Sequence, residues 1–150
     1  MALEDLYKEV ILDHYKNPRN KRSLEGAVQT CTANNPLCGD EITVHTRIED
    51  GRVTEVAFEG SGCSISQASA SMMTEAIDGR SLPEAEALAA DFRSMMEGSH
   101  DPTEEEFGDL VALKGVVKYP VRIKCAVLAW DVLQDSLAGS GVAGGGAPHA

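Results

Sequence analysis

Basic residues are scarce in this chain. Its 150 residues include 13 Lys and Arg against 24 Asp and Glu, which gives a formal net charge of -11 at pH 7. Binding to nucleic acid phosphates requires clustered Lys and Arg, so this composition argues against a nucleic-acid-binding protein. The same deficit argues against binding to an anionic membrane surface.

Long hydrophobic runs are also scarce. No apolar stretch approaches the roughly 18 residues that a membrane-spanning helix needs. The first residues, MALEDLYKEVILDHY, form an acidic amphipathic stretch without the basic and apolar regions of a signal peptide. We therefore expect a cytoplasmic protein with no membrane partner.

Cysteine is limited to four residues, and none of them forms a CxxC pair. A chain of this length buries roughly 68–70% of its unfolded surface, so it needs no disulfide to fold. In a reducing compartment, several thiols indicate metal binding or redox chemistry before they indicate disulfides.

The first half of the chain is predicted to form one helix and then a sheet. Apolar residues recur at helical spacing from Leu3 to His14, and Asn17-Pro18 ends that helix. Alternation of apolar and polar residues, with the hairpin signal Asp50-Gly51, predicts an antiparallel meander. Its three strands are expected at 26–34, 41–48 and 52–60.

The second half is predicted to be helical. Helices are expected at 63–77, 81–98 and 119–137, with an acidic, poorly periodic segment at 100–110. Strands followed by helices indicate an α+β fold, in which the helices pack on one face of a small three-stranded antiparallel sheet. We expect a single domain over 1–138, and a flexible glycine-rich tail over 139–150.

Three of the cysteines occupy positions that suit metal ligands. Cys38 ends a turn loop and is followed by Gly39 and Asp40, whereas Cys63 is predicted to begin a helix and Cys125 to lie in the first turns of the last helix. Helix N-termini favour the thiolate, which is the form that binds metals. Three thiolates and one carboxylate would complete a tetrahedral zinc site.

The residues alone leave a second interpretation open. Free cysteine is often simply buried, and Asp40 could be an ordinary turn residue. The long, irregular gaps between the cysteines do not decide between packing and a metal site.

Four motifs resemble one known family, in order, from about residue 3 to residue 138. They are LYKEVILDHYKNPRN, NPLCGDEI, FEGSGCSISQASASMMTEAI and RIKCAVLAW. They are similar to the U-type iron–sulfur cluster assembly family, which includes IscU, SufU and the N-terminal part of NifU. The resemblance implies a small antiparallel sheet packed against helices. It also implies that a zinc ion is bound by Cys38, Asp40, Cys63 and Cys125.

Two features resemble the SufU branch more than the IscU scaffolds. Scaffolds of the IscU type carry a histidine directly before the last cysteine, where this chain has Lys124, and they lack the extra stretch at 81–100. The resemblance then implies a zinc-dependent sulfurtransferase, in which Cys38 takes persulfide sulfur from a SufS-type cysteine desulfurase and passes it to a downstream iron–sulfur scaffold. The alternatives are a scaffold that assembles a [2Fe–2S] cluster and a binding module with structural zinc.

The remaining polar candidates are expected to have lesser roles. Cys31 is interpreted as a small core residue, His14 as a boundary residue with its hydrogen bonds met, and His45 as a residue of the solvent-facing side of its strand. His100 and His149 are expected in a loop and in the tail. Arg122 and Lys124 flank the last cysteine, where they would contact a partner, stabilise a persulfide, or remain solvated.

Overall fold

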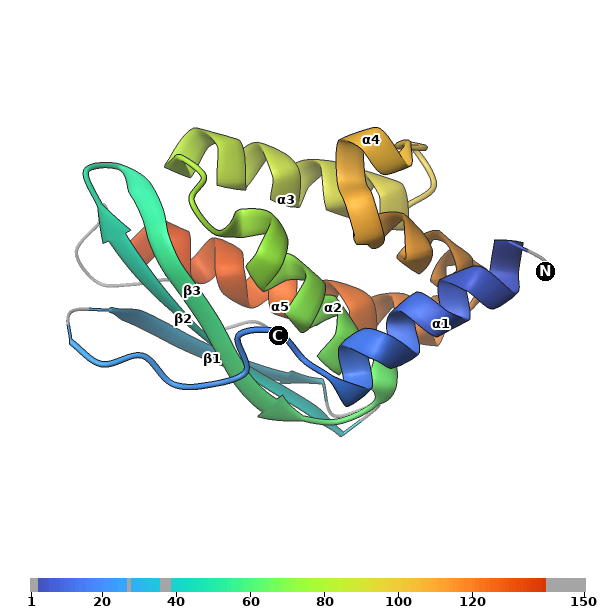
Figure 1. Cartoon of the computed structure of the whole chain (residues 1–150), viewed down its shortest axis with the longest axis horizontal. Helices are drawn as coiled ribbons and strands as arrows, with labels where there is room; N and C mark the ends of the chain where they lie inside the picture. Colours follow the sequence, from blue (N-terminus) through green and yellow to red (C-terminus); the bar gives the residue numbers. More distant parts are fainter. Residues whose placement is uncertain (1–2, 27, 36–38, 140–150) are drawn as a thin grey trace.

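The computed structural model describes residues 3–26, 28–35 and 39–139, and it forms the predicted α+β fold. The three strands make one sheet, and the helices cover one of its faces (Figure 1). The strands are β1 (Gln29–Asn35), β2 (Asp40–Glu49) and β3 (Arg52–Ser61). The helices are α1 (Leu3–Lys16), α2 (Ser64–Ile77), α3 (Leu82–Met96), α4 (Glu104–Phe107), the 3-10 helix η1 (Gly108–Lys118) and α5 (Pro120–Gly139).

The sheet is the predicted antiparallel meander, in the order β1-β2-β3. Asp50 and Gly51 connect β2 to β3 with φ angles of 52° and 73°. Positive φ at both central residues is the geometry that Asp-Gly favours in a tight hairpin. The hairpin sets the register in which Val44 faces Phe58, so both side chains reach the buried face.

The outer edge of β3 is covered by the segment that follows α1. The N–H of Arg22 donates to the carbonyl of Phe58 at 2.9 Å, and the N–H of Phe58 donates to the carbonyl of Asn20 at 3.0 Å. An exposed strand edge is a site for unwanted pairing with other chains, and this segment blocks it.

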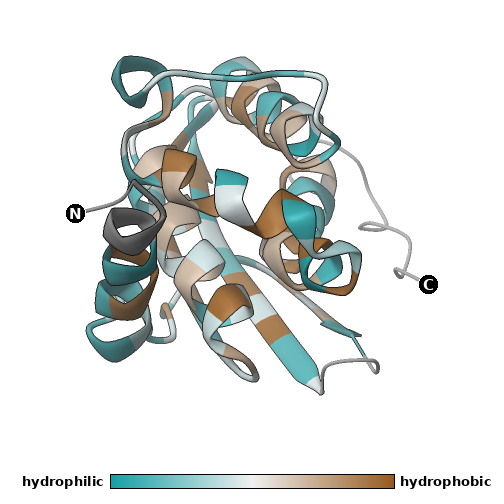
Figure 2. Cartoon of the chain, turned by 90° about the vertical axis from the view of Figure 1, so that its right-hand side faces the viewer, coloured by the Kyte–Doolittle hydropathy of each residue, from teal (hydrophilic) through white to brown (hydrophobic). Residues whose placement is uncertain are grey.

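The core lies between the sheet and the helices. Figure 2 shows hydrophobic residues on the inner sides of the helices and hydrophilic residues on their outer sides. At its centre, Phe92 of α3 stacks on Trp130 of α5 with ring centroids 4.4 Å apart, and Trp130 donates its indole N–H to Ser69 at 3.2 Å. This packing fixes α5 against α2. Cys125 lies in α5, and Cys63 directly precedes α2.

Local signals place the helix ends as predicted. Ser81 caps α3 with a full capping box, in which its hydroxyl accepts the N–H of Glu84. The acidic segment at 100–110 contains one short turn, α4, because Gly108 adopts a φ of 56° directly after it. The chain then continues as the 3-10 helix η1.

Two histidines are more buried than expected. His45 is only 7% exposed, because Thr30 and Glu59 of the neighbouring strands hydrogen-bond to its two ring nitrogens at 2.9 and 2.8 Å. His14 is fully buried rather than at the boundary, although its hydrogen bonds are met as predicted.

None of the described helices is long and apolar enough to cross a membrane.

Candidate metal centre

Asp40 is a buried carboxylate at the first residue of β2. It is only 1% exposed, and it pairs in the sheet with Asn35, the last residue of β1. Its Oδ1 accepts a hydrogen bond of 2.8 Å from the backbone N–H of Cys63. Since a buried polar group is costly without partners, this bond supplies one of the hydrogen bonds that the carboxylate needs at that position.

Cys63 begins α2, as predicted. It is the N-cap residue, its φ and ψ are -70° and 163°, and its thiol makes no capping bond. The thiol is therefore left to face Asp40, whose Oδ2 lies 3.8 Å from Cys63 Sγ. A sulfur at a helix N-terminus is stabilised as the thiolate by the helix dipole.

Gly62 allows the close approach of these two residues. Its φ is 140°, a conformation that side-chain-bearing residues rarely adopt. A Cβ on Gly62 would overlap Asp40 Oδ1 and would lie 2.8 Å from Asp40 Cα. Gly62 is thus required for two reasons: its backbone conformation, and the space beside it that Asp40 occupies.

Cys125 approaches from α5 and is fully buried. Its thiol lies 3.9 Å from the side-chain nitrogen of Asn35 and 3.9 Å from the carbonyl of Val121. Because α5 begins at Pro120, Cys125 lies beyond the first turn of the helix. Cys63 therefore lies at a helix N-terminus as predicted, whereas Cys125 lies in the second turn of its helix.

The fold brings one carboxylate and two thiols to a single point. Donor atoms of Asp40, Cys63 and Cys125 all lie within 4.8 Å of one another, although they come from β2, the start of α2 and α5. This donor set suits a tetrahedral metal that accepts both sulfur and oxygen, such as zinc. Cys38, the fourth expected ligand, lies outside the described residues.

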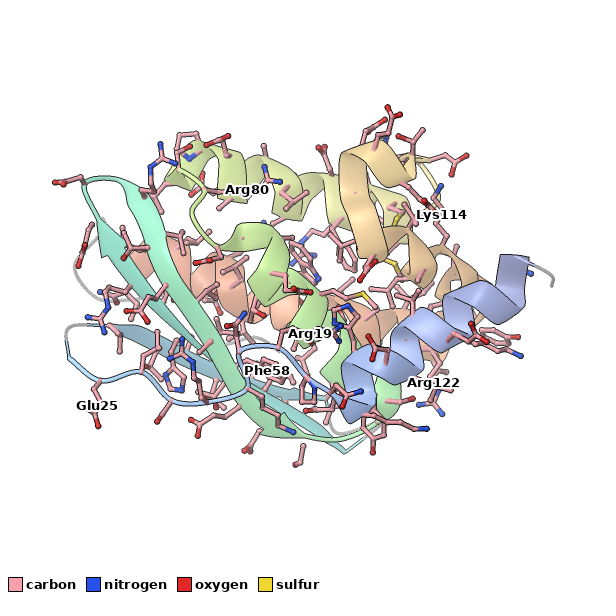
Figure 3. All side chains as sticks on the ribbon, viewed as in Figure 1. Arg19, Glu25, Phe58, Arg80, Lys114 and Arg122 are labelled. Atoms are coloured by element: carbon pink, nitrogen blue, oxygen red, sulfur yellow. The ribbon has the colours of Figure 1, made fainter. Side chains whose placement is uncertain are left out.

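Arg122 lies close enough to interact with both described cysteines. The pKa of its guanidinium is raised, first by the charge of the Cys63 thiolate and next by a hydrogen bond to Cys125. Arg122 is exposed near the start of α5 (Figure 3), and it adds positive charge at the rim of the site. Lys124 is also exposed, so the residue before Cys125 points away from the buried donors.

A hollow of about 380 Å³ opens next to the start of α2. Its lining is mostly apolar, and it also includes three basic side chains. The lining includes Ile11, Ile65, Tyr119, Lys8, Lys118 and Arg122. This hollow was not predicted from the sequence. Two exposed apolar residues, Tyr119 and Val121 (61% and 59% exposed), lie on either side of Pro120, the first residue of α5.

The other candidates lie apart from this cluster. Cys31 is half-buried in β1 against the core, where burial and, to a smaller extent, Asp135 raise the pKa of its thiol. His45 bonds to Thr30 and Glu59, and His100 packs edge-on against Phe107. His149 lies outside the described residues.

The chain matches a family model and several known proteins. The model for the NifU-like N terminal domain matches residues 6–138. The zinc-dependent sulfurtransferase SufU of Bacillus subtilis is 46% identical over 136 residues, which are 91% of this chain and 92% of that protein. The iron–sulfur cluster assembly scaffold protein IscU of Streptococcus pyogenes is 43% identical over 135 residues, which are 90% of this chain and 84% of that protein.

A solved structure of a similar protein has the same fold. It is described as an iron–sulfur cluster assembly scaffold protein for the SUF system from Fervidobacterium islandicum. It is 33% identical, superposes with a TM-score of 0.81, and covers 91% of this chain and 99% of its own. Fold and site together define a protein of the iron–sulfur assembly class. The chain belongs to the NifU-like N-terminal domain family, which includes IscU and SufU.

Gly62→Ala is expected to disrupt the centre without unfolding the core. The added methyl group would displace the Asp40 carboxylate. The variant should therefore purify with less than half as much zinc as the unchanged protein, as measured by elemental mass spectrometry. Gly98→Ala is the matched control, because Gly98 also has a positive φ, of 81°, but no atom lies within 4 Å of its added Cβ. Equal zinc content in both variants would contradict the role assigned to Gly62.

Proposed function

We propose that this protein is a zinc-dependent sulfur acceptor in iron–sulfur cluster biogenesis, with Cys38 as the residue that receives the sulfur. The observation that carries the proposal is that donor atoms of Asp40, Cys63 and Cys125 lie within 4.8 Å of one another. Cys38 comes two residues before Asp40 in the sequence. The naming of the Bacillus subtilis relative as a zinc-dependent sulfurtransferase supports it.

The covalent chain keeps Cys38 near these three residues. Cys38 is two residues before Asp40, and consecutive Cα atoms are about 3.8 Å apart, so the two Cα atoms are separated by at most about 8 Å. Gly39, between them, has a φ of 69°, a left-handed turn that suits glycine. We therefore assign Cys38, which comes between β1 and β2 in the sequence, as the fourth ligand.

Three of the four residues are anchored by described elements of the fold. Cys63 and Cys125 are fixed by α2 and α5, and Asp40 is fixed by its bond to the Cys63 N–H. When bound by these residues, zinc would keep the thiols deprotonated at neutral pH and protect them from oxidation. Cys38, which belongs to none of these anchoring elements, is the ligand whose release we expect to disturb them least.

Sulfur transfer to Cys38 would follow thiol–disulfide exchange chemistry. The Cys38 thiolate attacks the outer sulfur of a persulfide on the donor enzyme. The sulfur–sulfur bond of the donor breaks as the new one forms, and the donor cysteine leaves as a thiolate. The number of electrons is unchanged, and no oxidant or reductant is needed.

The donor would be a cysteine desulfurase of the SufS type, and a downstream iron–sulfur scaffold would receive the sulfur. The hollow beside α2 suits a docking loop of the donor because it combines an apolar wall with the positive charges of Lys8, Lys118 and Arg122. Arg122 also lies where it would stabilise the negative charge of a transferring persulfide.

Mass spectrometry tests the acceptor directly. The zinc-loaded protein is incubated with a SufS-type desulfurase and L-cysteine, and its peptides are then mapped. The peptide that contains Cys38 is expected to gain the mass of one sulfur atom. Cys38→Ala should gain none and should leave the desulfurase unstimulated, whereas the control Cys31→Ala should behave as the unchanged protein does. A Cys38→Ala protein that still stimulates the enzyme would contradict the assignment.

A second candidate function is a scaffold on which a [2Fe–2S] cluster is built. The name of the Streptococcus pyogenes relative favours it, and cysteine thiolates also hold the iron of iron–sulfur clusters. The presence of Lys124 instead of a histidine before Cys125 argues for sulfur transfer.

Visible absorption separates these two functions. The protein is incubated with iron, a sulfide source and a desulfurase. A sulfur acceptor should stay colourless and zinc-bound, whereas a scaffold would develop the brown colour of an iron–sulfur cluster. Stable colour with one cluster per protein or per pair of chains would overturn the proposed function in favour of the scaffold.

A further inference from the structure

A second group of possible metal ligands lies among α1, α2 and η1, apart from the centre described above. His14 of α1, Glu75 of α2 and Asp109 of η1 each offer a ligand atom, and these atoms all lie within 4.8 Å of one another. His14 is fully buried, whereas the side chains of Glu75 and Asp109 are 50% and 59% exposed. One imidazole from the interior thus faces two carboxylates at the surface.

The distances suit a shared cation. His14 Nε2 lies 2.9 Å from Asp109 Oδ2 and 3.8 Å from Glu75 Oε1. With bonds of about 2.1 Å, neighbouring ligand atoms around one metal ion are about 3.0 Å apart in octahedral and about 3.4 Å apart in tetrahedral geometry. Small side-chain adjustments would bring all three atoms to one ion.

The imidazole of His14 is held in the orientation of a ligand. Its Nδ1 lies 2.8 Å from Ser71 Oγ, which also accepts the backbone N–H of Arg19 at 2.9 Å. A serine hydroxyl can accept two hydrogen bonds, so Nδ1–H can donate to it and leave the Nε2 lone pair toward the carboxylates. Metal-binding histidines are commonly fixed in this way through their other ring nitrogen.

The charges around His14 are compatible with a cation at this point. Arg19 forms its closest ion pair with Asp13, at 2.7 Å, and its Nε is 3.8 Å from Glu75 (Arg19 is labelled in Figure 3). In one tautomer of His14, Nε2–H donates to Asp109 at 2.9 Å. In the other tautomer the Nε2 lone pair faces two carboxylates, an arrangement that a metal ion between the three atoms would make favourable.

A hollow provides room for the rest of a coordination shell. Glu75 and Asp109 line a cavity of about 230 Å³, together with apolar groups that include Met72 and Phe107. A water molecule occupies about 30 Å³ of liquid, so the cavity can hold several water ligands beside the two carboxylates.

We propose that His14, Glu75 and Asp109 form a second metal site, which binds a first-row divalent cation such as Mn²⁺ or Fe²⁺ with water as the remaining ligands. One nitrogen and two oxygen donors suit these ions, whereas the thiolates of the first centre select softer ones. The site would join α1, α2 and η1. It is independent of the proposed sulfur transfer.

Manganese is the probe that separates the two sites. The full chain, with its first centre loaded with zinc, is titrated with Mn²⁺, and the free ion is counted by electron paramagnetic resonance. We expect one additional Mn²⁺ to bind, and its paramagnetism to broaden the NMR signals of residues near His14, Ser71 and Asp109 rather than those near Cys125. No saturable binding up to about 1 mM Mn²⁺ would overturn the proposal.

Conservative variants locate the ion. Asp109→Asn keeps a hydrogen-bond acceptor for His14 but loses the anionic ligand, and we expect roughly tenfold or greater loss of Mn²⁺ affinity; Glu75→Gln should weaken binding in the same direction. Glu59→Gln is the matched control, because Glu59 pairs with His45 at 2.8 Å in the same way but belongs to no three-ligand group among the described residues. Unchanged affinity in both Asp109→Asn and Glu75→Gln, with circular dichroism confirming the fold, would refute the site.

Discussion

The hydrogen bond from the Cys63 N–H to Asp40 holds the candidate centre together, because it joins the first residue of β2 to the first turn of α2. It places a carboxylate that is only 1% exposed beside two thiols. Burying a carboxylate costs several kcal/mol when its charge is not compensated. A bound cation would supply that compensation from within, whereas Arg122 supplies positive charge only from the exposed rim. The same buried geometry would therefore favour a bound cation at this position.

The rest of the fold keeps these donors in place. The hairpin at Asp50-Gly51 sets the register that brings β2 and β3 together at the site, and the stacking of Phe92 on Trp130 helps to fix α5, which carries Cys125. Cys38 comes between β1 and β2 in the sequence, and among the described residues β1 pairs only with β2. In the proposed sulfur transfer, the ligands anchored by these elements would stay in place while Cys38 is released.

Local chemistry made much of this predictable from the sequence. Asp-Gly at the hairpin, the capping box at Ser81 and proline at the start of α5 each determine a nearby boundary, and all three are found in the structure. The resemblance also identified Asp40, Cys63 and Cys125, which the fold brings together. Burial of His14 and His45 was not predictable, since it depends on partners such as Asp109, which is 95 residues away from His14. The hollow beside α2 is likewise created by tertiary packing, for which helical periodicity gives no signal.

X-ray absorption at the zinc edge tests the central claim most directly, because it counts the atoms bound to the metal without disturbing the protein. We predict a shell of three sulfur atoms at about 2.3 Å and one lighter atom at about 2.0–2.2 Å. In Cys38→Ala the sulfur count should fall to two, with an additional light atom in its place. A shell made only of nitrogen and oxygen, or a sulfur count unchanged by Cys38→Ala, would contradict the assembly of Cys38, Asp40, Cys63 and Cys125 around one ion.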